Sequence, residues 1–149
     1  MAPFYYRPLE IDKAKALRLS NGNYDALVRL SNEAKKELSW WITNIMSWLQ
    51  HIHVPDPDIT IYTDSSTLGW GVTDGKNPSG GRWKAEEINH INVLELKAIL
   101  IGVQTYCKRK NYKHVRVMSD NIAAVSYVNN KGGIKSEFCN KIAKELWVW

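Results

Sequence analysis

Three acidic residues stand at the ends of predicted secondary-structure elements. Asp64 ends the run ITIYTD at residues 59–64, whose β-branched and aromatic residues are typical of a buried strand. Glu95 falls in the first turn of a predicted helix, and Asp120 ends the strand-like run HVRVMSD. Because a mixed sheet can bring such ends together, the sequence predicts a cluster of three carboxylates.

Each carboxylate also has a purely structural interpretation. Asp64 could cap a turn, and Asp120 could be the N-cap of the helix that follows it. Glu95 with Asn92 matches a capping box, in which a glutamate reaches back to the backbone amide three residues earlier. Both interpretations stay open for each residue taken singly, but the occurrence of all three in one small sheet favours a cluster.

Crowded carboxylates repel one another and raise one another's pKa values unless a cation neutralises them. Hard oxygen ligands with no thiol or imidazole nearby select Mg²⁺, or alternatively Mn²⁺, over zinc. Two such ions about 4 Å apart activate a water and stabilise the leaving oxygen in phosphodiester cleavage. The sequence therefore predicts a site for two Mg²⁺ ions that acts on a nucleic-acid backbone.

The net charge of +5 is unevenly distributed over the 149 residues. Residues 1–58 hold 7 Lys+Arg and 7 Asp+Glu, whereas residues 59–149 hold 13 and 8. A basic second part indicates a polyanionic partner, although a solvated lysine-rich surface would give the same balance.

The segment HIHVPDPD at residues 51–58 divides the chain, because its two prolines forbid a continued helix. Before it we expect a helix at 7–19, a loop at 20–30 and a second helix with Ser31 as N-cap. The apolar residues of this second helix fall on one face, which should pack as core or interface: Leu38, Trp41, Ile42, Ile45, Trp48 and Leu49.

After the prolines the pattern predicts three strands, a helix, a strand and two more helices. The strands are expected at 59–63, 68–73, 81–85 and 114–119, with the turn sequence TDGKNPSGG before the third. The helix after the third strand has a predicted buried stripe at Val93, Leu96, Leu100, Val103 and Cys107. This order predicts a mixed α/β fold.

Neither a signal peptide nor an apolar run near the 18 residues of a membrane span is recognisable in the sequence. We therefore expect a soluble intracellular protein of the cytoplasm or nucleus, without a membrane partner. Cys107 and Cys139 have no ligand-spaced companions and are expected to be reduced core residues.

The second part of the chain resembles the ribonuclease H domain of a retrotransposon polyprotein, most closely the DIRS type, which pairs reverse transcriptase with a tyrosine recombinase. The matching segments are YTDSSTLGWGV, HINVLELKA, VMSDNIAAVSYVNNKGG and KSEFCNKIAKELW, in the family's order across residues 59–149. Two earlier segments, YYRPLEIDKAKAL and LSNEAKKELSWWITNI, resemble the connection from reverse transcriptase to ribonuclease H. The resemblance thus implies a helical connection segment at 1–58 and a ribonuclease H-like domain at 59–149.

The implied fold is a ribonuclease H-like mixed sheet, with three antiparallel strands, then a parallel strand, and flanking helices. The family continues into a fifth strand, a histidine-bearing loop and a last helix with a fourth acidic ligand, and these are missing from this sequence. We therefore expect a C-terminally incomplete domain with three of four carboxylates. The strand at 114–119 should then have an open edge that self-associates or is covered by part of residues 1–30.

The implied activity is hydrolysis of the RNA strand of an RNA–DNA hybrid with two Mg²⁺ ions, as part of a retroelement reverse transcriptase. Asp64 would bridge both ions, Glu95 would bind one and position the water, and Asp120 would complete the site. The implied partners are the hybrid and the reverse transcriptase domain of the same polyprotein. The resemblance also implies contacts to nucleic acid, including the 2′-hydroxyls of RNA, from Ser65, Ser66, Asn92 and Asn121.

Two other functions compete with hybrid cleavage. A non-catalytic module on the same fold, inactive because it is truncated, would bind the hybrid without cutting it. A DDE transposase or integrase core has its second carboxylate at a strand end and its third in a later helix. Here Glu95 is helical and Asp120 ends a strand, so the order disfavours that class.

Overall fold

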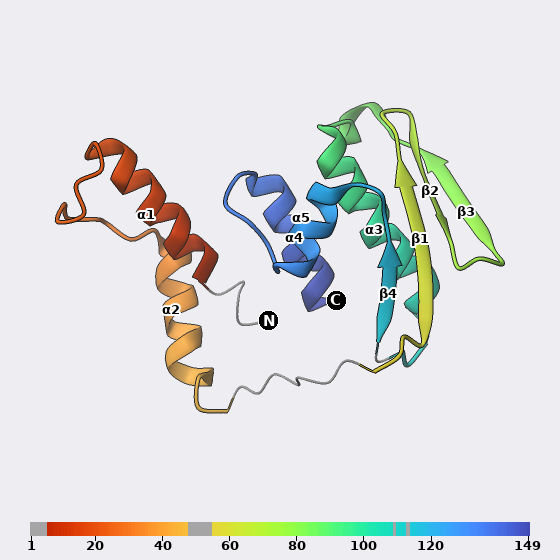
Figure 1. The fold of residues 1–149 in the computed structure, drawn as a ribbon, viewed down its shortest axis with the longest axis horizontal. Helices are drawn as coiled ribbons and strands as arrows, with labels where there is room; N and C mark the ends of the chain where they lie inside the picture. The colour runs from red at the N-terminus through yellow and green to blue at the C-terminus, as the bar shows by residue number, and fades with distance from the viewer. Residues whose placement is uncertain (1–5, 48–54, 109, 113) are drawn as a thin grey trace.

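The computed structural model describes residues 6–47, 55–108, 110–112 and 114–149 (Figure 1). Its elements, in chain order, are α1 (Arg7–Leu19), α2 (Asn32–Asn44), β1 (Ile59–Ser65), β2 (Gly69–Thr73), β3 (Pro78–Arg82), the 3-10 turn η2 (Ala85–Glu87), α3 (Ile91–Cys107), β4 (Val115–Met118), α4 (Ile122–Asn129) and α5 (Glu137–Val148). The predicted order of helices and strands is confirmed. In the described part of the chain, no helix has the length and apolar character needed to cross a membrane.

The four strands form one mixed sheet in the order β3-β2-β1-β4. β1 pairs antiparallel with β2 and parallel with β4, and β2 pairs antiparallel with β3. This confirms the predicted α/β class, in an arrangement consistent with a ribonuclease H-like fold. Within the described residues, β4 pairs with β1 alone, and no strand from 6–30 lies along its other edge.

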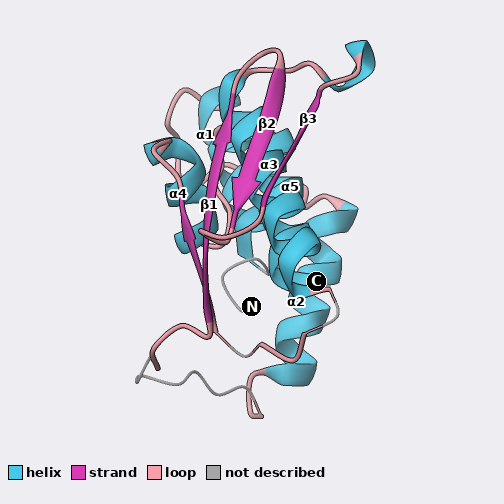
Figure 2. Ribbon diagram, turned by 90° about the vertical axis from the view of Figure 1, so that its right-hand side faces the viewer, coloured by secondary structure: helices cyan, strands magenta, loops and turns pink. Residues whose placement is uncertain are grey.

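Helix α3 crosses one face of the sheet, where it contacts β1 and β2 (Figure 2). Gly102 permits this close packing, because a Cβ there would lie only 3.1 to 3.3 Å from side chains of Thr63, Ile61 and Val72. Burial of apolar side chains on this face stabilises the packing of α3 on the sheet. Figure 2 shows the helices behind the sheet and its opposite face uncovered by any helix that the structure describes.

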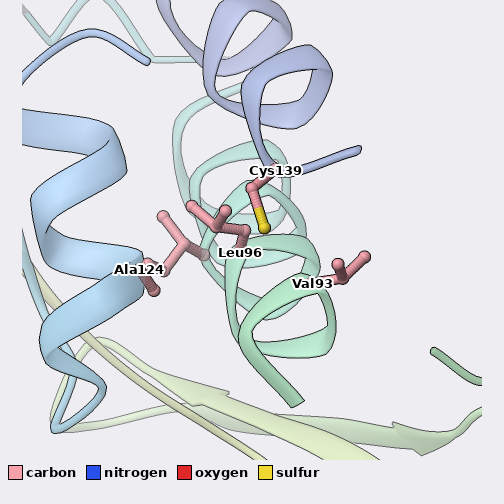
Figure 3. Packing of buried hydrophobic residues seen from close by; sticks show 5 residues of the cluster. Val93, Leu96, Ala124 and Cys139 are labelled. Atoms are coloured by element: carbon pink, nitrogen blue, oxygen red, sulfur yellow. The ribbon is translucent and has the colours of Figure 1, made fainter. Parts of the chain in front are cut away.

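The other side of α3 packs against α4 and α5. Val93 and Leu96 belong to one buried cluster with Ala124 of α4 and Cys139 of α5, and Figure 3 shows Leu96 next to Ala124 and Cys139. Most of the predicted stripe of α3 is buried as expected. The burial extends around the helix to Leu94 and Ala98, because α3 lies between the sheet and the two later helices. Cys107 and Cys139 are buried free thiols, as the sequence predicted.

The third strand is three residues out of place in the sequence prediction, which put its start at Gly81 rather than Pro78. The proline is tolerated because β3 is an edge strand, and the glycines allow close pairing. A Cβ at Gly80 would lie 2.9 Å from the Trp70 carbonyl oxygen. Trp83, assigned to the strand from sequence, instead follows it, is buried, and donates from Nε1 to the Ser66 carbonyl at 2.9 Å.

The two N-terminal helices pack on each other, and α2 begins as predicted, with the Ser31 hydroxyl accepting from the Ala34 amide at 3.2 Å. Polar contacts between described residues join this pair to the later helices. Lys144 Nζ of α5 lies 2.5 Å from Glu37 Oε1, and Arg7 donates to the Asn130 carbonyl at 3.0 Å.

The predicted apolar face of α2 is only partly correct. Ile42 and Ile45 are 81% and 57% exposed, whereas Ala34 and Glu37 are buried. Leu38 and Trp41 of the predicted face are half-buried, and the fully buried residues of α2 lie in its first half. Trp48 and Leu49 lie outside the described residues.

Candidate metal and nucleic-acid site

Asp64, Glu95 and Asp120 converge as predicted. One carboxylate oxygen from each residue lies within 4.8 Å of the others. Asp64 is on β1, Glu95 is on α3, and Asp120 lies two residues after the end of β4. The parallel pairing of β1 and β4 brings the ends of these strands to the same edge of the sheet, and α3 packs on β1, so all three residues meet there.

The helix caps exclude two of the structural interpretations. His90 is the N-cap of α3, and its Nδ1 accepts from the Asn92 amide at 3.2 Å. Asn92 is therefore inside the helix, the predicted capping box is wrong, and Glu95 lies in the second turn rather than the first. Asn121 is the N-cap of α4, and its Oδ1 accepts from the Ala124 amide at 2.8 Å, so Asp120 is not the cap.

Asp64 makes a local contact. Its Oδ1 accepts from the Ser65 amide at 2.8 Å, while the side chain remains exposed. In the β1–β2 ladder it faces Gly71, and a Cβ at Gly71 would meet nothing within 4 Å. The space in front of Asp64 is therefore open to a ligand.

Glu95 is the buried member of the cluster, with 3% of its surface exposed. Burial, together with the negative charges of Asp64 and Asp120, raises the pKa of Glu95 from 4.5 to about 7. Its Oε2 is buried without a hydrogen-bond partner among the described residues. A buried, unpartnered oxygen facing two other carboxylates is an unfavourable arrangement that a bound cation would stabilise.

The cluster holds oxygen ligands only, which suits Mg²⁺ or Mn²⁺. Each oxygen ligand of Mg²⁺ lies about 2.1 Å from the ion, so oxygens within 4.8 Å of one another could share an ion after moving inward. Mg²⁺ usually keeps several waters and takes substrate phosphate oxygens as further ligands. The three carboxylates could therefore hold an ion and leave ligand positions for a substrate.

Ser66 has a structural task in the turn between β1 and β2. Its hydroxyl accepts from the amides of Leu68 and Gly69 at 3.2 and 3.3 Å, and its own amide donates to the Gly69 carbonyl at 2.9 Å. Ser65 is half-buried beside Asp64, and its hydroxyl makes only long contacts, of 3.3 and 3.4 Å, to carbonyls of the same turn. Of the two predicted contacts to RNA, Ser65 has the more available hydroxyl.

Asn92 and Asn121 bond to each other. Asn121 Nδ2 donates to Asn92 Oδ1 at 3.1 Å, and both side chains are half-buried next to the carboxylates. The sequence identified both residues but not their pairing, which depends on how α3 and α4 pack.

Trp70 and Arg82 are site residues that the sequence prediction missed. They line a hollow of about 340 Å³ together with Asp64, Ser65 and Gly71. The strand register could have identified Arg82 from the sequence, because Arg82 lies opposite Gly69 in the β2–β3 ladder. That register depended on the misplaced third strand.

Comparison of the chain with models of protein families, with curated proteins and with solved structures found no match. The convergence of the three carboxylates is therefore an observation from the structure alone.

Proposed function

We propose that this protein hydrolyses the RNA strand of RNA–DNA hybrids with bound Mg²⁺ ions. The proposal rests chiefly on one observation, the placement of Asp64, Glu95 and Asp120 with carboxylate oxygens within 4.8 Å of one another. The order of these residues along the chain, and the motifs around them, resemble those of ribonuclease H domains. The excess of 13 Lys+Arg over 8 Asp+Glu in residues 59–149 supports a polyanionic substrate.

Two bound Mg²⁺ ions would supply an activated water and stabilise the leaving oxygen of the phosphodiester. Asp64, the exposed residue on β1, would bridge the ions. Glu95 would bind one ion through one oxygen and accept a hydrogen bond from the water through Oε2, which lacks a partner among the described residues. Asp120 would complete the ligand set. The products would carry a 5′-phosphate and a 3′-hydroxyl.

The RNA strand would be recognised by groups beside the metal site. A hydroxyl that can both donate and accept is suited to a ribose 2′-hydroxyl, the group that distinguishes RNA from DNA. Ser65 has such a hydroxyl next to Asp64. Asn92 has an amide group on the same side of α3 as Glu95, one turn earlier, and would contact a base edge.

The second candidate is a module that binds the hybrid without cutting it. The observation that favours it is the size of the acidic cluster, which has three members among the described residues. Glu137 and Glu145, the acids that follow Asp120 in the sequence, are exposed on α5, and Glu137 pairs with Lys141 at 3.3 Å. A site with fewer carboxylates would hold the second ion weakly.

The proposal also assigns a role to the N-terminal part of the chain. Residues 1–58 would connect a reverse transcriptase domain to the nuclease within one retroelement polyprotein, acting in the cytoplasm or nucleus. The packing of α1 on α2 and the contact of Glu37 with Lys144 support a rigid connection.

A panel of substrates tests the reaction. The same sequence is prepared as RNA–DNA hybrid, double-stranded RNA, double-stranded DNA and single-stranded RNA, each labelled on one strand and incubated with Mg²⁺. We expect cleavage of the RNA strand of the hybrid alone. Binding of the hybrid without cleavage would favour the second candidate, and cleavage of all substrates alike would contradict the proposal.

A further inference from the structure

The hollow beside Asp64 is formed by the sheet register. Directly paired residues share a face of a sheet, as do residues two positions apart on one strand. Asp64 pairs with Gly71, and Gly69 pairs with Arg82, so these four residues lie on one face. Two glycines of β2 thus form the floor, and the side chains of Asp64 and Arg82 stand at its two sides.

This hollow is preformed by backbone contacts. The turn at its end is held by Ser66, which accepts from two amides, and by Trp83, which donates to the Ser66 carbonyl at 2.9 Å. Trp70, which also lines the hollow, lies against Gly81, where an added Cβ would be 3.0 Å from its ring. A volume of about 340 Å³ falls in the range of ligand sites, roughly 300–1,000 Å³.

The side chain of Arg82 makes no hydrogen bond or ion pair with any residue in the described part of the chain, and it is exposed. It is the one cation among the residues that line the hollow. A guanidinium has five donors in a planar fork that matches the oxygens of a phosphate. Its strand is two strand spacings from that of Asp64, roughly 10 Å, so it would meet a different phosphate from the one at the carboxylates.

We propose that Arg82 binds a backbone phosphate of the strand that is cut, next to the phosphodiester at the acidic cluster, with the intervening sugar over Gly69 and Gly71. Arg82 would then be a positioning residue that sets how this strand enters the metal site. The proposal rests on the proposed nuclease function, because the strand in the hollow is the one whose phosphodiester reaches Asp64.

The test is the affinity for a fluorescent RNA–DNA hybrid, measured by anisotropy over a series of salt concentrations. Ca²⁺ replaces Mg²⁺, since it takes the same oxygen ligands in a looser geometry. Arg82→Gln should weaken binding about tenfold, as expected for a charged hydrogen bond. It should also reduce the slope of log affinity against log salt by about 0.7 to 0.9, the loss of one phosphate contact. Arg18→Gln, which removes an equivalent exposed charge from α1, should change neither quantity.

Gly71→Val gives an independent result, because an added Cβ meets nothing within 4 Å and the strand backbone accepts a valine. It should fold normally, by circular dichroism and thermal melting, yet weaken hybrid binding by filling the hollow. The role of the hollow would be overturned if Arg82→Gln bound the hybrid as tightly as Arg18→Gln does, or if Gly71→Val bound it as tightly as wild type does. Either result would leave the nuclease proposal intact. If wild type does not bind the hybrid at low salt, both proposals fail.

Discussion

Asn121 Nδ2 donates a hydrogen bond to Asn92 Oδ1 at 3.1 Å, and this bond joins the two elements that hold Glu95 and Asp120. Asn92 lies one helical turn before Glu95 on α3. Asn121 follows Asp120 and caps α4 through its Oδ1. The pair therefore holds two acidic residues from distant parts of the sequence in a fixed relation, against their mutual repulsion.

Two substitutions of Asn121 separate its roles. Asn121→Ala removes the cap and the bond to Asn92, and should lower the free energy of unfolding by about 1 kcal/mol. Asn121→Ser keeps a capping hydroxyl but is too short to reach Asn92, so its stability should remain close to wild type. Both should weaken Mg²⁺ binding, by about tenfold, as for other groups that orient metal ligands. Chemical denaturation and calorimetric Mg²⁺ titration provide the two measurements, and an unchanged Mg²⁺ affinity for Asn121→Ser would show that the pair does not position the ligands.

Glu95 makes stability depend on pH when no metal is bound. Its pKa is about 7 in the folded protein, against an ordinary value of 4.5. Between these values the folded state binds more protons than the unfolded state, so the free energy of unfolding falls as pH rises from about 4.5 to about 7. The full effect is on the order of 3 kcal/mol.

Glu95→Gln should remove most of this slope. In EDTA, the variant should be more stable than wild type at pH 8 and closer to it at pH 4.5. Mg²⁺ should reverse the order at pH 8, because wild type gains stability from the ion and the variant gains less. Urea denaturation at both pH values gives the comparison, and a wild-type stability that is flat across this window would contradict the burial of a strained carboxylate.

The contact between Glu37 and Lys144 should contribute to the attachment of α2. Glu37 is 8% exposed, and its Oε1 lies 2.5 Å from Lys144 Nζ. Glu37→Ala should cost about 1.5 to 3 kcal/mol, the range for hydrogen bonds between charged groups. The matched control is Glu33→Ala on the same helix, an exposed first-turn residue whose loss should cost less than about 1 kcal/mol. Equal losses for the two variants in urea denaturation would mean that the contact adds nothing.

The free edge of β4 should favour pairing with a second copy. β4 pairs only with β1 among the described strands, and its outer edge includes Val115 and Val117. Such edges pair with other chains unless charges or prolines oppose it. We expect light scattering to show association that rises with concentration, and Met118→Lys, at an exposed position, to reduce it. A monomer at all concentrations, with rapid amide exchange along 115–118, would rule this association out.

The convergence of the carboxylates could be predicted because it depends on coarse features. Asp64 lies near the end of a buried strand, Asp120 follows its parallel partner, and a helix packs on the sheet, so the acids come together even when boundaries are uncertain. The caps could not be predicted in this way. The N-cap of α3 is His90 rather than Asn92, and the N-cap of α4 is Asn121 rather than Asp120. Such a shift of one or two residues decides whether a carboxylate takes part in a cap. It depends on backbone angles that the sequence pattern does not report.

The position of Arg82 depends on pairing across three strands. The sequence PSGGR reads as a turn, because proline and glycines dominate turns, yet it forms an edge strand through close contact with β2. Tertiary contacts decide this outcome over local preference. The same applies to Ile42, whose exposure follows from where α2 finds a partner rather than from its helical spacing.

The central claim is that the acidic cluster is the metal site of a nuclease, and its most direct test is the Mg²⁺-dependent cleavage rate of a labelled hybrid by wild type and Asp64→Asn. We predict that wild type cuts the RNA strand only when Mg²⁺ or Mn²⁺ is present. The cleavage rate of Asp64→Asn should fall by more than about 100-fold, which is the upper range for loss of a residue that only orients a metal ligand. Its affinity for the hybrid should change little. Equal cleavage rates for the two proteins, or cleavage by wild type in EDTA, would contradict the claim.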